Sequence, residues 1–130
     1  MPEPIRALLL IAHGSRRAEA NADLRHVADE LLARGRYPVV EVSYLELAEP
    51  TIAAGGARCV DRGATEVILL PYFLSAGVHV REDMAGARAD LAARFPAVTF
   101  RLAEPLGRHP LLLDVVDQRA REAEGTRPGG

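Results

Sequence analysis

The stretch LLLIAHGSRR, residues 8–17, is an apolar run that stops at a histidine, a glycine and a serine and then becomes doubly basic. A second apolar run, EVILLPYF at residues 66–73, is followed by SAGVHVRED at residues 75–83. Nearly continuous apolar runs of this length are typical of strands that are covered on both faces of a sheet. We therefore expect two central strands, each of which leads into a loop that carries polar residues.

The rest of the chain alternates between strand-like and helix-like patterns. Residues 39–45 and 98–102 mix apolar and polar side chains, which indicates edge strands. The expected helices carry apolar stripes at helical spacing; they lie at about residues 24–32, 50–63, 84–95 and 110–124. This alternation predicts an α/β fold: a three-layer sandwich with a four-stranded, mainly parallel sheet and helices on both faces. Right-handed crossovers and apolar central strands favour the strand order 2-1-3-4.

Composition and charge predict a single domain without a general affinity for nucleic acid or membranes. The chain has 130 residues, 48% of them hydrophobic, and a net charge of −2, which favours one globular domain. We expect this domain at residues 5–124 and a flexible tail at residues 125–130. Cys59, the single cysteine, is interpreted as a buried structural thiol. The apolar run at residues 7–12 is too short to span a membrane, so we expect a cytoplasmic protein.

Three chemically active residues follow the first three expected strands: His13, Glu46 and His79. The separations 46 − 13 and 79 − 46 are both 33 residues, because two strand-helix units of similar length lie between them. Parallel sheets bind ligands outside the carboxyl ends of their strands, where the strand order reverses. Neighbouring strands lie about 4.8 Å apart, so the three side chains are expected to converge. Two imidazoles and a carboxylate suit a borderline divalent metal such as Co²⁺, Ni²⁺ or Fe²⁺.

Each of these residues also has an ordinary interpretation. His13 alone fits a strand-end histidine that bonds a loop carbonyl, and Glu46 alone fits a solvated carboxylate at an edge. His79 alone fits a loop residue without a role, and it is the expected convergence that favours a site. His26 and His109 are interpreted as structural or surface residues.

Three motifs together resemble a known family. LLLIAHGSRR at residues 8–17, VSYLELAEPTI at 42–52 and LLPYFLSAGVHVREDM at 69–84 resemble, in order and spacing, the sirohydrochlorin chelatases. These are the class II chelatases of cobalamin and siroheme synthesis, and the resemblance covers about residues 7–115. It implies that His13 and His79 bind metal and accept protons, with Glu46 as a further ligand or proton relay.

The resemblance also implies a reaction, a substrate and an assembly. The family inserts Co²⁺, Fe²⁺ or, in some members, Ni²⁺ into sirohydrochlorin without ATP or an organic cofactor. This macrocycle is rich in carboxylates, so basic, hydroxyl and glycine residues near the crevice are expected to bind it: Gly14, Ser15, Arg16, Arg17, Ser75, Gly77 and Arg81. Short members resemble half of the two-lobed chelatases and pair as homodimers.

The final helix is consistent with such a dimer. It has more apolar residues than one stripe facing the core requires, namely Leu111, Leu112, Leu113, Val115 and Val116. We therefore expect a symmetric homodimer whose clefts open toward the interface.

Two other functions stay open at this point. A phosphohistidine enzyme would also place His-Gly after a first strand, but such enzymes need an arginine immediately before the histidine, where this chain has Ala12. A non-catalytic carrier of metal or tetrapyrrole would use a similar site and is distinguished only by the lack of turnover.

Overall fold

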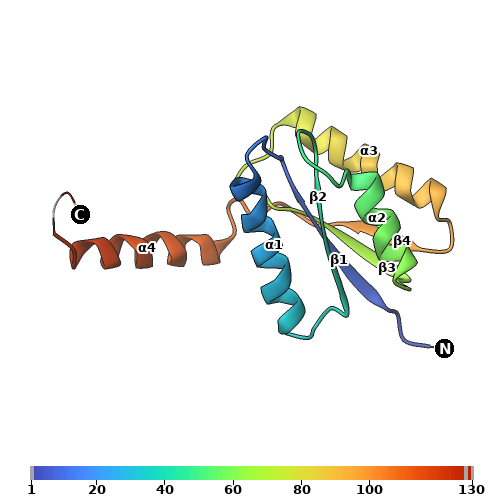
Figure 1. Ribbon diagram of the computed structural model, residues 1–130, viewed down its shortest axis with the longest axis horizontal. Helices are drawn as coiled ribbons and strands as arrows, with labels where there is room; N and C mark the ends of the chain where they lie inside the picture. The colour runs from blue at the N-terminus through green and yellow to red at the C-terminus, as the bar shows by residue number, and fades with distance from the viewer. Residues whose placement is uncertain (1, 128, 130) are drawn as a thin grey trace.

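The computed structural model describes residues 2–127 and 129 and contains a parallel sheet of four strands in the order β2-β1-β3-β4 (Figure 1). The strands and helices alternate along the chain as predicted: β1 (Arg6–Ala12), α1 (Ala18–Ala33), β2 (Val39–Tyr44), α2 (Ile52–Asp61), β3 (Glu66–Pro71), α3 (Val78–Arg94), β4 (Thr99–Leu102) and α4 (Pro110–Glu124). All three neighbouring pairs of strands are parallel. The expected α/β fold, strand order and edge strands are confirmed.

The central strand β1 supplies both faces of the core by simple alternation. Ala7, Leu9 and Ile11 belong to one apolar cluster, whereas Leu8 and Leu10 belong to the other. All five are buried, which is why this strand appears in the sequence as a continuous apolar run.

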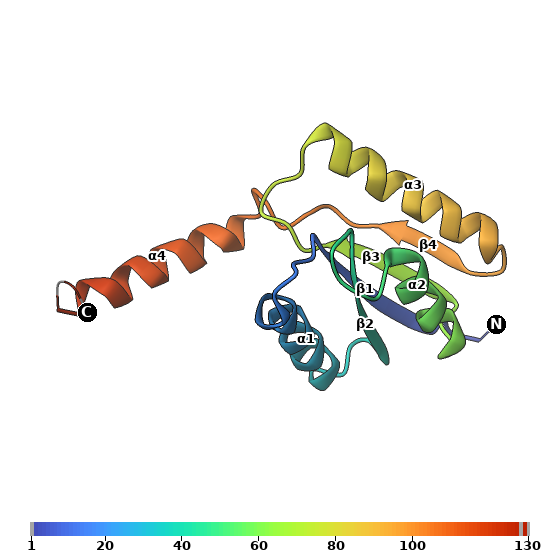
Figure 2. The same cartoon turned by 45° about the horizontal axis from the view of Figure 1, so that its top comes forward.

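The two faces of the sheet are covered differently. Helices α2 and α3 pack on one face, where Cys59, Met84 and Leu91 join the larger cluster. On the other face α1 contributes Leu24 and Ala28, and it packs on β2 and β1 (Figures 1 and 2). The thiol of Cys59 is fully buried, and this burial raises its pKa to about 12. The interpretation of Cys59 as a structural thiol is therefore consistent with its surroundings.

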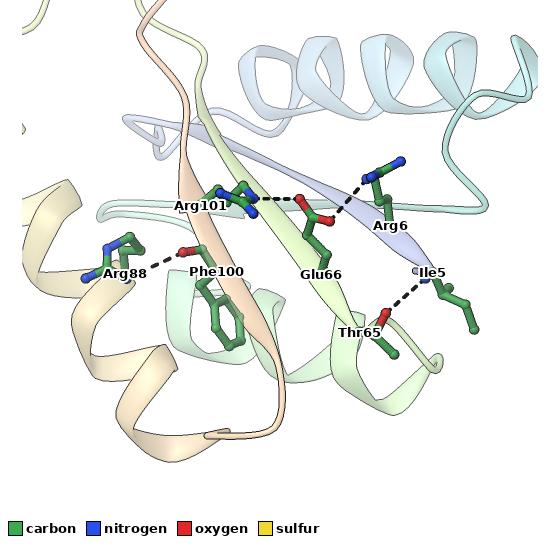
Figure 3. A network of polar contacts seen from close by, with 7 residues as sticks. All are labelled: Ile5, Arg6, Thr65, Glu66, Arg88, Phe100 and Arg101. Carbon is green, nitrogen blue, oxygen red and sulfur yellow. Dashed lines mark hydrogen bonds and ion pairs between the residues drawn. The ribbon is translucent and has the colours of Figure 1, made fainter. Parts of the chain in front are cut away.

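At the amino end of the sheet, ion pairs connect three strands (Figure 3). Glu66 on β3 accepts hydrogen bonds from Arg101 on β4 at 2.8 Å and from Arg6 on β1 at 3.1 Å. The bond from Arg101, followed by that from Arg6, lowers the pKa of the Glu66 carboxyl group. At this end of the sheet, the charged side chains of Arg6, Glu66 and Arg101 thus pair with one another.

The structure differs from the sequence predictions most clearly in three elements: β3, α3 and α4. β3 ends at Pro71 instead of residue 73, and α3 starts at Val78, so His79 lies in the first turn of a helix and not in a loop. The last helix has the expected bounds, but it contains no buried residue. We expected one apolar stripe of α4 to face the core, and this was wrong because α4 extends away from the sheet (Figures 1 and 2).

The fold does not test the flexible tail expected at residues 125–130 or the expected cytoplasmic location. The tail expected at residues 125–130 includes residues 128 and 130, which lie outside the described residues. Within the described part of the chain, no helix combines the length and the apolar character needed to cross a membrane.

Candidate functional site

The backbones of His13 and Glu46 lie side by side just beyond the carboxyl ends of β1 and β2. Leu45 N donates a hydrogen bond to Ala12 O at 2.9 Å, and Glu46 N donates one to His13 O at 3.0 Å. The two strands therefore remain paired beyond their last regular residues. Both side chains are exposed, so an imidazole and a carboxylate from neighbouring strands face solvent at the same edge.

Gly14 allows this close pairing. Its backbone has φ +96°, a conformation that residues with a side chain rarely adopt. A Cβ atom at this position would also collide with the carbonyl oxygen of Glu46 and come within 3.2 Å of the Cβ of Tyr44. The absence of a side chain at Gly14 therefore lets the Glu46 segment approach closely, and the expected role of Gly14 in binding the macrocycle stays a prediction.

The ring of His13 is supported by the segment that follows β3. It stacks on Phe73 with a centroid separation of 4.4 Å and an angle of 32° between the rings. Phe73 is buried, and the chain before it is held by a 2.7 Å hydrogen bond from Tyr72 N to Ile11 O. Sequence reasoning missed this contact, because Phe73 was interpreted only as the end of an apolar strand.

Ser15 organises the turn between β1 and α1. Its backbone N donates to Asn21 Oδ1 at 3.0 Å, and Asn21 Nδ2 donates back to its carbonyl oxygen at 2.8 Å. The Ser15 hydroxyl accepts a hydrogen bond from Arg17 N at 3.0 Å, and Tyr44 donates its hydroxyl proton to Asn21 O at 2.9 Å. Burial raises the pKa of Tyr44, an effect that Arg25 partly offsets. Asn21 was not singled out from the sequence, although it holds the turn that follows His13.

The predicted arginines lie on two sides of this edge. Arg16 and Arg17 are exposed and form no ion pair with another described residue. Arg81, in the first turn of α3, reaches Glu104 at 3.5 Å, and both side chains are more than half exposed. A surface pair of this kind is weak, so these three guanidinium groups remain available to an anionic ligand.

The loop after β4 adds a part that the sequence did not predict. Together with Ser75 and Arg81, it surrounds a hollow of about 350 Å³ that is completed by Pro105, Gly107 and Arg108. Gly107 N donates to Phe73 O at 3.2 Å, which joins this loop to the segment after β3. Arg108 is a further basic residue at this hollow.

Apolar side chains are exposed beside the candidate residues. Leu47 follows Glu46, Leu74 precedes Ser75, and Val78 precedes His79; all three are at least half exposed. Gly77 forms the N-cap of α3, and the space around its Cβ position is open. Exposed apolar groups beside polar ones are typical of a ligand site.

The expected three-residue metal site is only partly assembled. The structure pairs the segments of His13 and Glu46, and it positions His79 in the first turn of α3, the helix that follows β3. Among residues 2–127 and 129, no three His, Cys, Asp or Glu side chains come together as a metal-binding group. The convergence of all three therefore stays a prediction.

The two remaining histidines lie elsewhere. His26 is exposed on α1. His109 is the N-cap of α4, where its Nδ1 accepts a hydrogen bond from Leu111 N at 3.1 Å. Both positions fit the structural or surface role expected for them.

The protein has an α/β chelatase fold. This follows from the order of the strands, the helices on both faces of the sheet and the solved structures that the chain matches. A CbiX protein from Marinobacter aquaeolei VT8 superimposes with a TM-score of 0.78 at 32% identity, over 93% of this chain and 99% of that one. The sirohydrochlorin chelatase SirB from Bacillus subtilis subspecies spizizenii, solved in complex with cobalt, gives 0.81 at 32% identity, over 90% of this chain and 50% of that one.

A sequence relative gives the same result. The chloroplastic sirohydrochlorin ferrochelatase of Arabidopsis thaliana is 39% identical over 112 residues, which are 86% of this chain and 50% of that protein. The family model described as CbiX matches residues 7–123. The chain therefore belongs to the CbiX family. It spans half or less of the length of several curated relatives that it matches.

Proposed function

We propose that this protein inserts a divalent metal, Co²⁺, Fe²⁺ or Ni²⁺, into sirohydrochlorin, and that it needs neither a nucleotide nor an organic cofactor. The observation that supports this most directly is the pairing of the His13 and Glu46 segments at the sheet edge in a chain that matches the CbiX model almost throughout. The names of the relatives, which include a ferrochelatase and a cobalt-bound chelatase, support the same reaction.

The proposed reaction requires the macrocycle to lose its pyrrole N–H protons while the metal loses its protein ligands or waters. Neutral histidine can hold a borderline metal and can accept a proton. His13 and His79 would take these roles, and Glu46 would complete the ligand set or pass protons to solvent. The Phe73 ring would fix the orientation of the His13 imidazole, which is stacked on it.

The macrocycle would be held by both apolar and basic groups. Leu47, Leu74 and Val78 offer exposed apolar contacts beside the candidate residues. Arg16 and Arg17, which form no ion pair with another described residue, would bind substrate carboxylates. Arg81 would exchange its weak pair with Glu104 for such a contact. Ser15, Ser75 and Gly77 would border the ligand.

A homodimer is part of this proposal. A tetrapyrrole is large relative to one four-stranded sheet, and ligand sites normally bury most of the ligand surface. A second subunit would supply the missing wall, as a second lobe would in a longer chain. The cytoplasm stays the predicted compartment.

The test is a metal-insertion assay with sirohydrochlorin and each of Co²⁺, Fe²⁺ and Ni²⁺, followed by visible absorption under anaerobic conditions. We expect many turnovers per chain with at least one metal, at a rate above that of the protein-free reaction. Binding of sirohydrochlorin or metal with at most one turnover would instead support a carrier. Hydrolysis of a generic phosphoester without metal insertion would support the phosphohistidine alternative.

A further inference from the structure

Two residues with side chains have a left-handed backbone conformation, and both lie at the carboxyl end of the sheet. Within residues 2–127 and 129, these are Leu47 with φ +64° and Arg108 with φ +66°. Leu47 follows Glu46 in the loop after β2, and Arg108 lies in the loop between β4 and α4. Leucine and arginine rarely adopt this conformation, because the Cβ atom comes too close to the following carbonyl oxygen. Both residues therefore carry a conformational cost that a glycine would avoid.

At the amino end of the sheet, the residues with this conformation are glycines. Gly35 with φ +78° follows α1, and Gly63 with φ +96° follows α2. Apart from the neighbours of each residue in the chain, no described atom lies within 4 Å of either Cβ position. The chain thus has glycine where only the backbone conformation matters, and it accepts the cost at Leu47 and Arg108. Strain of this kind is typical of positions where function requires a particular side chain.

Arg108 is the stronger case, because its turn has a glycine at a different position. His109 N donates a hydrogen bond to Leu106 O at 3.1 Å, which closes a four-residue turn with Arg108 in third place. Turns with a positive φ at the third residue normally have glycine or asparagine there. Gly107 is instead the second residue, where a Cβ atom would collide with Leu74 O. Packing explains this glycine, whereas the arginine beside it requires another reason.

Neighbouring contacts hold Arg108 in its conformation. On one side Gly107 N donates to Phe73 O at 3.2 Å, and on the other the Nδ1 atom of His109 caps the first turn of α4. Phe73 also stacks on the ring of His13. The turn is therefore fixed to the segment that supports His13, and a change to a more common conformation at Arg108 would break these contacts.

Arg108 lines a basic hollow at the edge of the candidate site. The hollow has a volume of about 350 Å³ and is also lined by Ser75 and Arg81; of the described residues that line it, none is acidic. Glu104, which pairs with Arg81 at 3.5 Å, lines a neighbouring hollow of about 220 Å³. Arg108 is exposed and forms no ion pair with another residue that the structure describes. Two guanidinium groups and a hydroxyl around one hollow favour an anionic ligand.

We propose that Arg108 is a specificity-determining residue of the substrate site. It binds a carboxylate at the periphery of the macrocycle, in the hollow that it shares with Ser75 and Arg81. This inference rests on the proposed function, since it assigns sirohydrochlorin to the hollow. It adds the connection between β4 and α4 to the three segments of the candidate site. The left-handed conformation of Arg108 is the cost of placing a guanidinium group at this point of the rim.

The contact is expected to affect affinity for the macrocycle and not the chemistry of metal insertion. A residue that holds the periphery of the substrate stabilises the bound substrate and the transition state equally. Loss of such a contact raises Kd and KM, and the loss of activity appears in KM rather than in kcat. A residue with only a structural role would instead change the midpoint of unfolding.

Titration of metal-free sirohydrochlorin, followed by its visible absorption, tests the contribution of the charge. Arg108→Gln should raise the Kd about 10-fold, the order expected for one charge-assisted hydrogen bond. Arg108→Lys keeps the charge without the planar fork, so its Kd should lie between those of the wild type and Arg108→Gln. Added salt should reduce the difference between the wild type and Arg108→Gln, because exposed charges are screened. The matched control is Arg34→Gln, at the exposed C-cap of α1, which should bind like the wild type. An unchanged Kd in Arg108→Gln would overturn the proposal.

Arg108→Gly separates the side chain from the backbone conformation. Glycine adopts φ +66° readily, and this relief offsets the greater freedom of glycine in the unfolded chain. We therefore expect a urea midpoint equal to or above that of the wild type, together with the same loss of affinity as in Arg108→Gln. Maintained stability with weaker binding is not expected of a structural residue. A lower midpoint with an unchanged Kd would identify Arg108 as structural and would also overturn the proposal.

Metal insertion is measured separately on the same proteins. If the wild type binds sirohydrochlorin and Arg108→Gln weakens this binding, but neither inserts metal, the result counts against the proposed function alone. If the wild type inserts metal and Arg108→Gln has the same Kd and KM, the role of Arg108 is rejected and the proposed function stands.

Discussion

The two ends of the sheet differ in whether their charged side chains form ion pairs. At the amino end, the Glu66 carboxylate lies between the guanidinium groups of Arg6 and Arg101 and pairs with both, which links three strands. At the carboxyl end, Arg16 and Arg17 find no ion-pair partner among the described residues, and His13 and Glu46 expose their side chains.

This contrast distinguishes a structural end from a binding end. In a parallel sheet of this kind the carboxyl ends of the strands lead into the loops before the helices, and ligands bind outside these ends. Groups that pair internally contribute to stability, whereas groups without partners are available for a ligand. Substitutions at the carboxyl end should therefore affect metal insertion, and those at the amino end should affect stability.

The largest effect is expected from the histidines. His13→Ala and His79→Ala should each lower the rate of metal insertion at least about 100-fold, because positioned acid-base groups contribute roughly 10² to 10⁴ in rate. Both side chains are exposed, so the unfolding midpoint should change little. The assay follows visible absorption with sirohydrochlorin and the preferred metal. His26→Ala, on exposed α1, is the matched control and should retain full activity. Wild-type rates in both site variants would remove these residues from the site.

Gly14→Ala should combine a stability loss with a damaged site. The backbone at φ +96° costs a residue with a side chain about 1 kcal/mol or more, and the new Cβ would collide with Glu46 O. We expect the free energy of unfolding, measured in urea, to fall by about 2 kcal/mol. Gly63→Ala is the matched control, since Gly63 has the same φ and open space around its Cβ position. Equal losses of unfolding free energy in the two variants would show that the chain avoids the collision with Glu46 without a further loss of stability.

The sequence predicted the sheet, and the position of His13 and Glu46 at one edge of it, because both depend on local patterns. The continuous apolar runs of β1 and β3 required central positions, and the strand order then directed His13 and Glu46 to one edge. The direction of α4 was not predictable, because Leu113 and Val116 give the same apolar pattern whether they face their own core or another chain. The Phe73 contact was also missed, since it depends on how a loop bends after β3.

Glu46→Gln tests the carboxylate without changing its shape. The amide has nearly the same size and shape as the carboxylate, but it lacks the charge and the ability to accept a proton. We expect about a 10-fold lower rate of metal insertion, equivalent to about 1.4 kcal/mol in the barrier, and unchanged stability. Leu45 and Glu46 pair with β1 through backbone atoms, so the substitution should leave the edge intact. An unchanged rate would make Glu46 an ordinary solvated carboxylate.

Glu66→Gln is expected to have the smallest effect, and it tests the amino end of the sheet. The bonds from Arg101 and Arg6 lower the pKa of Glu66 in the folded chain, so folding favours its ionised form. Its contribution to stability is therefore present above the carboxyl pKa of the unfolded chain, about 4.3, and is lost as the pH falls through the lower folded value. At pH 7 the variant should be slightly less stable than the wild type in urea, and the unfolding free energies of the two proteins should approach each other below about pH 4.

Metal insertion at neutral pH should not change, because Glu66 lies at the amino end of β3, whereas the candidate residues follow the carboxyl ends of the strands. A stability difference that persists at low pH would mean that the amide disturbs packing rather than charge, and a loss of metal insertion would contradict the separation of the two ends.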